Sequence, residues 1–129
     1  MLLSKLRQRL QQDEGFTLIE LLVVLVIIAV LLAIAVPSYL GFKDRAEKRA
    51  AASNVRATIP AVEAWYSDHN NYSFGSAATL RLSYDAGLAA TVVATPVGSG
   101  ASYCVSDTQG THTYRKAGPA ATITSGAAC

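Results

Sequence analysis

The chain has 129 residues, of which 51% are hydrophobic and 16% charged, and its formal net charge at pH 7 is +2. A chain of this length is one domain's worth. The net charge is too small to argue for a nucleic-acid partner, so DNA binding is possible but is not predicted.

The amino-terminal segment is polar and charged. Lys5, Arg7 and Arg9 precede the acidic pair Asp13 and Glu14. Such a segment in front of an apolar run is typical of a targeting leader, which takes no part in the mature fold. We therefore set residues 1–15 apart as a leader.

The apolar run that follows is long enough to cross a membrane. It extends from Phe16 to Val36, ends at Pro37, and carries Glu20 as its one charged side chain. A helix needs about 20 mostly apolar residues to cross a hydrocarbon core of ~30 Å. We expect residues 16–37 to form one transmembrane helix.

Glu20 is costly inside such a helix. A charged side chain in a spanning helix costs roughly 2.5–3.5 kcal/mol, so it usually has a partner and a function. Asp13 and Glu14 are acidic and cannot supply that partner. Cutting the chain after Gly15 would create one, because the new α-amino group of Phe16 is a cation at the same membrane depth.

The stretch Gly15-Phe16-Thr17-Leu18-Ile19-Glu20-Leu21 resembles the cleavage and methylation signal of type IV pilins and of type II secretion and DNA-uptake pseudopilins. The resemblance continues to Pro37. It implies that a prepilin peptidase cuts between Gly15 and Phe16 and methylates the Phe16 nitrogen. It also implies that Phe16, Glu20 and Pro37 serve assembly, with Glu20 pairing with the Phe16 amine of a neighbouring copy.

The partners and location implied by this resemblance are those of a filament subunit. They are further copies of the chain in a helical homo-oligomer, other pilins or pseudopilins, the peptidase, an assembly platform in the inner membrane, and the membrane itself. The subunit is expected to be a single-pass cytoplasmic-membrane protein before assembly, and afterwards part of a filament in the periplasm or outside the cell.

Several alternatives stay open. Within the family, the chain could be a pseudopilin of a secretion or competence system instead of a pilin. Outside it, Ala33-Ile34-Ala35 resembles the small-residue cleavage pattern of an ordinary secretory signal, which would release a small binding module. A single-span receptor is the other choice, and neither of these two explains Glu20 beside Gly15 and Phe16.

Beyond Pro37 the helical pattern resumes over residues 38–70. Val55, Ile59, Val62 and Tyr66 recur at the spacing of one helix face. Pro37 and Pro60 each remove a helical hydrogen bond, so we expect kinks there. The helix is expected to end near residue 68, before turn-forming residues.

The remaining residues, 71–129, are rich in Gly, Ser, Thr and β-branched side chains. We expect three or four short antiparallel strands packed on the helix face around Val62, Trp65 and Tyr66. The candidates are residues 79–84, 90–95, 101–106, 111–116 and 121–124, of which the first is equally readable as a loop or a short helix. The predicted class is α+β, a long kinked helix on a small β-sheet head like that of type IV pilins.

Cys104 and Cys129 are the chain's two cysteines. Export permits a disulfide between them, and many type IV pilins close their carboxyl region in this way, which favours a pilin over a pseudopilin. Two free thiols are the alternative.

No catalytic constellation, cofactor motif or metal site is predicted. His69 and His112 lie far apart and show no metal-ligand spacing with the cysteines. Asp107 has no acidic residue nearby that would complete a calcium loop. We expect no enzymatic activity.

Overall fold

The computed structural model describes residues 15–129, which belong to two compact units, residues 15–40 and Gly41–Cys129. Apart from Gly15, the predicted leader lies outside the described residues. The division into leader, span, second helix half and head stays a prediction.

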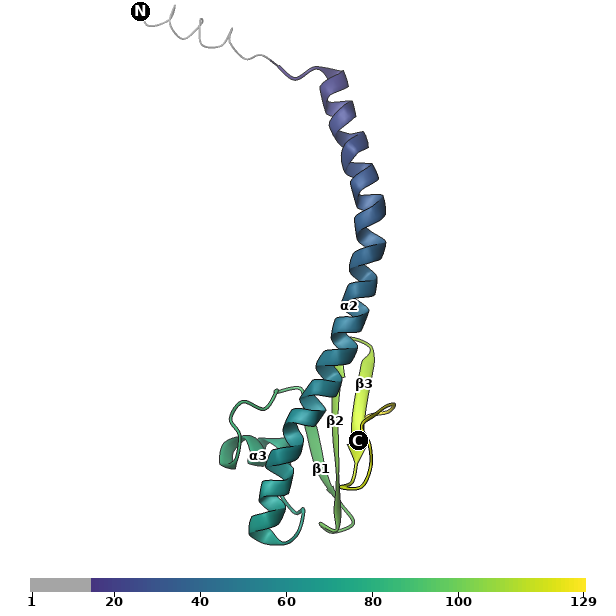
Figure 1. Cartoon of the computed structure of the whole chain (residues 1–129). Coiled ribbons are helices and arrows are strands. Elements are labelled where there is room, and N and C mark those ends of the chain that lie inside the picture. The colour runs from purple at the N-terminus through teal and green to yellow at the C-terminus, as the bar shows by residue number, and fades with distance from the viewer. Residues whose placement is uncertain (1–14) are drawn as a thin grey trace, which may run out of the picture. The chain divides into compact units, whose positions relative to one another are not determined.

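One long helix, α2 (Leu18–His69), dominates the described chain (Figure 1). The helix is continuous through both Pro37 and Pro60. The predicted end near residue 68 is therefore correct within one residue, and Asn70 follows with a positive φ of 58°, which closes the helix. The kinks stay predictions.

The second unit contains a four-stranded antiparallel sheet in the order β1-β2-β3-β4. Its strands are β1 (Val93–Val97), β2 (Ser102–Gln109), β3 (His112–Ala117) and β4 (Thr124–Ser125). Four of the five predicted strands are present with shifted ends. The α+β class is confirmed.

The first of the predicted strands, residues 79–84, is wrong as a strand. The structure has a short helix here, α3 (Ala77–Ser83), which is the alternative that the sequence left open. The segment alternates polar and apolar residues, which imitates a strand. Ala77 and Leu80 are buried at helical spacing, however, and Leu82 is 89% exposed, so burial follows the helical period.

The core lies between the second half of α2 and one face of the sheet (Figure 1). Val55 and Val62 from α2 are fully buried with Tyr103 and Val105 of β2. Trp65 packs against this cluster as predicted. Tyr66, which was also predicted to lie there, is 39% exposed and instead stacks on Tyr72.

Polar contacts bind the β2–β3 hairpin to α2. Asp44 Oδ1 lies 2.6 Å from His112 Nε2, and Asp44 Oδ2 accepts a hydrogen bond from Lys48 at 2.7 Å. The bonds to Lys48 and then to His112 lower the pKa of the Asp44 carboxyl. Gly110, with φ +58°, forms the hairpin turn so close to Glu47 that a Cβ would lie 2.1 Å from Glu47 Oε2.

The disulfide holds the carboxyl-terminal segment against the sheet. Cys129 is bonded to Cys104 in the central strand β2, which confirms the predicted pairing. The Cys129 amide also donates a hydrogen bond to Ser106 Oγ at 3.2 Å. Cys104 and Ser106 are buried on the sheet face opposite to the one that carries Tyr103 and Val105.

Replacing Val62 with alanine should lower the free energy of unfolding of the head by about 2 kcal/mol, because it removes two buried carbons and leaves a cavity. Urea unfolding of the detergent-solubilised chain, followed by fluorescence of its single tryptophan, measures this. The control Val93→Ala, at a site that is 47% exposed, should change it by less than about 0.5 kcal/mol. Equal losses would contradict the assigned core.

A second prediction concerns alkaline pH. Burial, followed by the charge of Glu63 and the hydrogen bond to it, raises the pKa of the Tyr103 hydroxyl. The fold thus favours the neutral phenol, whose contribution is complete below the ordinary tyrosine pKa of about 10 and is lost as pH rises above it. Stability should fall by up to about 1.4 kcal/mol per pH unit for this group. Tyr103→Phe should flatten the decline, and an equally steep decline in that variant would contradict the assignment.

Candidate functional site

The charged group in the apolar half of α2 is the carboxylate of Glu20. It lies in the first turn of the helix. Residues 15–40 contain no lysine, arginine or histidine, so this unit offers Glu20 no cationic side chain. Its compensation within the unit has to come from hydrogen bonds.

Thr17 supplies these hydrogen bonds. Its backbone N–H donates to Glu20 Oε2 at 2.8 Å, and its hydroxyl lies 2.7 Å from the same oxygen. The Glu20 amide approaches Thr17 Oγ1 in return, at 3.3 Å. These contacts form a capping box, in which a threonine before the helix and a glutamate in its first turn satisfy each other's backbone donors.

Thr17 was not among the predicted site residues, although the sequence contains a signal for its role. The pattern Thr17-Leu18-Ile19-Glu20, directly before a long apolar run, has the spacing of a capping box. The residue that holds the Glu20 carboxylate could therefore have been identified from the sequence.

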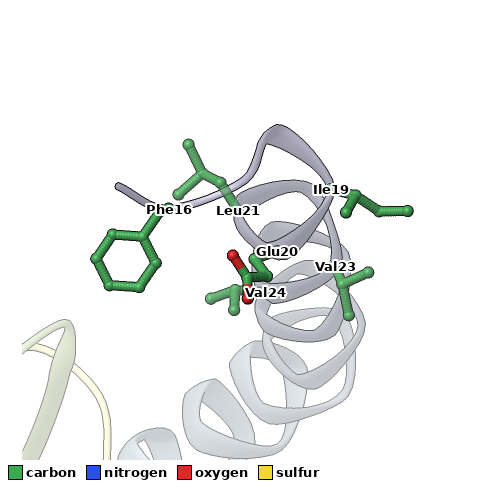
Figure 2. A pocket seen from close by; sticks show the side chains of 6 residues that line it. All are labelled: Phe16, Ile19, Glu20, Leu21, Val23 and Val24. Carbon is green, nitrogen blue, oxygen red and sulfur yellow. The ribbon is translucent and has the colours of Figure 1, made fainter. Parts of the chain in front are cut away.

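The bond between Gly15 and Phe16 precedes the helix. Both residues are exposed, and within residues 15–129 no atom other than those of Gly15 and its chain neighbours lies within 4 Å of the position that a Cβ on Gly15 would take. Figure 2 shows the Phe16 ring and the Glu20 carboxylate toward one side of the helix end, with Ile19 and Val23 on the other. Among the residues that the structure describes, the segment around this bond is thus open to another protein.

The apolar side chains of this unit are exposed along its whole length. From Leu18 to Val36 no residue is buried or half-buried, and Pro37 is exposed as well. Within residues 15–129, α2 is the one helix that is long and apolar enough to cross a membrane. Lipid or other apolar helices have to cover this surface.

His69, His112 and Asp107 make contacts within the fold. His69 stacks on Trp65, with ring centroids 3.9 Å apart, and His112 contacts Asp44. Asp107 is buried and accepts hydrogen bonds from Asn54 and Gln109. Within residues 15–129 no three His, Cys, Asp or Glu side chains group together as metal ligands would.

These features define a class of protein. An apolar helix with a hydrogen-bonded acid in its first turn continues into a second half that packs on a small, disulfide-closed sheet. This is the architecture of the membrane-stored subunits of type IV pili and related filaments.

Comparison with known proteins agrees with this class. Residues 11–36 match the family model of the prokaryotic N-terminal methylation motif. The chain is 31% identical over 96 residues to the type IV wide pilus major component PilA4 of Thermus thermophilus, covering 74% of the chain and 73% of that relative. The chain belongs to the type IV pilin family.

Two further relatives match about half of the chain. The type IV major pilin protein PilA of Myxococcus xanthus is 39% identical over 62 residues, or 48% of the chain. The type II secretion system core protein G of Escherichia coli is 39% identical over 61 residues, or 47% of the chain. The chain spans only 28% and 42% of these two relatives.

The capping box predicts how Thr17→Val would behave in the uncut chain. Losing the hydroxyl removes the acceptor for the Glu20 amide, at a cost of about 1 kcal/mol, so that amide should exchange its hydrogen about fivefold faster. Hydrogen exchange followed by NMR in detergent micelles measures this. Thr17→Ser keeps the hydroxyl and should exchange at nearly the original rate, and an unchanged rate in Thr17→Val would contradict the cap.

Proposed function

We propose that this protein is an exported structural subunit that a prepilin peptidase cuts between Gly15 and Phe16, and that the product polymerises into a type IV pilus or a closely related filament. The proposal adds methylation of the Phe16 nitrogen. Phe16, Glu20 and Pro37 are the residues to which we assign assembly.

The observation that supports the proposal is that Glu20 has no opposite charge near it within residues 15–40. Its carboxylate sits at the start of a helix whose other side chains, through Val36, are uncharged, and residues 15–40 provide no basic side chain. Thr17 satisfies hydrogen bonds of this carboxylate but brings no opposite charge. An acid in an apolar helix of membrane-spanning length, with no cation beside it, favours an intermolecular partner.

Cutting after Gly15 would supply that partner. The new ammonium group on Phe16 would lie next to the capping residue Thr17, in the same layer of the membrane as the carboxylate. In the stored subunit, the Thr17 contacts hold the carboxylate in one place. In the filament, the Phe16 amine of a neighbouring copy would add the missing positive charge, with Thr17 keeping Glu20 oriented toward it.

The energetics agree with a specific role for this pair. Moving the span from lipid into a bundle of other spans removes little further apolar area from water, because lipid is already apolar. The side chains from Leu18 to Val36 therefore contribute mainly packing. Specificity would have to come from the shape of the helix faces and from the Glu20 pair.

The remaining partners follow from this role. They are other pilins or pseudopilins, the peptidase and an assembly platform in the inner membrane. Before assembly the chain would be a single-pass protein of the cytoplasmic membrane, with its head exported. After assembly the filament would lie in the periplasm or at the cell surface.

A second candidate is a pseudopilin of a type II secretion or competence system. The similarity to the secretion core protein G of Escherichia coli favours it, since that match has the same identity as the match to PilA of Myxococcus xanthus. The longer similarity to a wide-pilus component and the disulfide support the pilus. Deleting the gene and scoring surface pili and protein secretion separately would distinguish the two.

Replacing Glu20 with alanine should leave membrane insertion intact but lower the yield of sheared filaments at least about tenfold. The reason is that an unpaired amine in the filament core should destabilise the filament by more than about 1.4 kcal/mol, which corresponds to a factor of ten. Immunoblots of membrane and filament fractions measure both quantities. Normal filament yield from Glu20→Ala would contradict the assembly role.

Glu20→Gln separates charge from capping. Its amide oxygen can still accept from the Thr17 N–H, which preserves the cap, but it carries no charge. Glu20→Gln should therefore assemble as poorly as Glu20→Ala. If it assembled normally, hydrogen bonding rather than charge pairing would be the function of Glu20.

A further inference from the structure

An exposed column of arginines runs along α2 in the head unit. Arg45, Arg49 and Arg56 are all exposed, and their spacing places them within about 40° of one another around the helix. The ion pairs among residues 15–129 join Lys43 with Glu47, and Asp44 with Lys48 and with His112. None of these ion pairs involves Arg45, Arg49 or Arg56. We call these three residues the arginine column.

The carboxylates of the head divide into two groups. Asp44, Glu47, Glu63 and Asp107 are half-buried or buried, and each carboxylate contacts a polar or charged side chain of the head. Asp44 and Glu47 face lysines, Glu63 accepts from two tyrosine hydroxyls, and Asp107 accepts from two amides. These four acids are not available to the arginine column.

Asp68 and Asp85 form the second group. Both are exposed, and neither takes part in an ion pair within the described residues. Tyr84 connects the two: its hydroxyl donates a hydrogen bond to Asp68 Oδ2 at 2.6 Å, and it directly precedes Asp85 in the chain, whose Oδ1 accepts a hydrogen bond from the Gly87 amide. We call these two residues the acidic corner.

Exposed small and apolar side chains accompany both groups. Ala46, Ala50 and Ala57 are exposed and repeat the spacing of the arginine column one residue further on. They therefore form a strip of small side chains beside the column, which we call the alanine strip. Leu82, three residues before Asp85, is 89% exposed. Leu82 is thus an exposed apolar side chain close in sequence to the acidic corner.

We propose that the arginine column of one copy receives the acidic corner of a second copy, with Leu82 of the second copy packing on the alanine strip. The occupant is another copy of this chain because the same head carries an exposed positive surface and an exposed negative one, and neither forms an ion pair within residues 15–129. A contact between two different patches is head-to-tail, and it generates a continuing helical assembly where the rotation between copies does not close a ring. This inference rests on the proposed filament function and assigns the contact between heads.

The positions of the two surfaces set the offset between copies. The middle of the arginine column precedes Asp68 by about 18 residues, or about 27 Å of helix at 1.5 Å per residue. If two parallel copies are displaced by about 27 Å along the helix axis, the arginine column of one copy lies at the same height as the acidic corner of the other. Phe16 and Glu20 lie only four residues apart in the sequence, so the head contact and the Glu20 pair would involve different neighbours.

Charge reversal in filament-forming cells tests the contact. R45E with R49E, and separately D68K with D85K, should each lower the yield of sheared filaments about tenfold relative to the membrane-stored subunit. The four changes combined should restore at least half of the original yield, because the charges are again opposite. Reduced yield in both single-surface variants with recovery in the combined variant would support the proposal.

Arg115→Glu is the matched control, since Arg115 is exposed, unpaired within the described residues and located on β3. It should assemble normally. An equal loss in this control, normal assembly of either reversed surface, or no recovery in the combined variant would each overturn the proposal. The failure of the proposed function itself would appear differently, as absence of wild-type filaments or of cleavage after Gly15.

Discussion

The structure depends on one carboxylate placed in an apolar helix. Glu20 begins a helix that is otherwise uncharged through Val36, and residues 15–40 offer it no cation. Thr17 satisfies its hydrogen bonds locally through a capping box, which lets the subunit be stored in a membrane without leaving the acid bare. The absence of an opposite charge is what the proposed cut and assembly would correct.

The two halves of α2 have different environments, and the sequence reflects this difference. The first half exposes apolar side chains on all sides, whereas the second half buries Val55 and Val62 against the sheet and exposes charged residues elsewhere. The head is closed by the disulfide and by the contact of Asp44 with His112. The arginine column and the acidic corner are exposed and form no ion pair within the described residues, and we propose that they contact other copies.

Much of this could be predicted because the signals are local or periodic. The first half of α2 follows from a long apolar run, its second half from the spacing of Val55 and Val62, and β2 and β3 from short segments with β-branched and aromatic residues between turns. Residues 79–84 were misleading because their alternation imitates a strand, and only tertiary burial of Leu80 reveals the helix. The pairing of Asp44 with His112 spans 68 residues, so no local pattern encodes it.

Intact mass combined with amino-terminal sequencing of the protein from membranes and sheared filaments tests the central claim most directly. The account predicts a chain that begins at Phe16 with one methyl group on its nitrogen. A chain that begins at Val36 would indicate ordinary secretion. An uncut chain that begins at Met1, in cells that contain the peptidase, would indicate a simple membrane protein and would equally contradict the account.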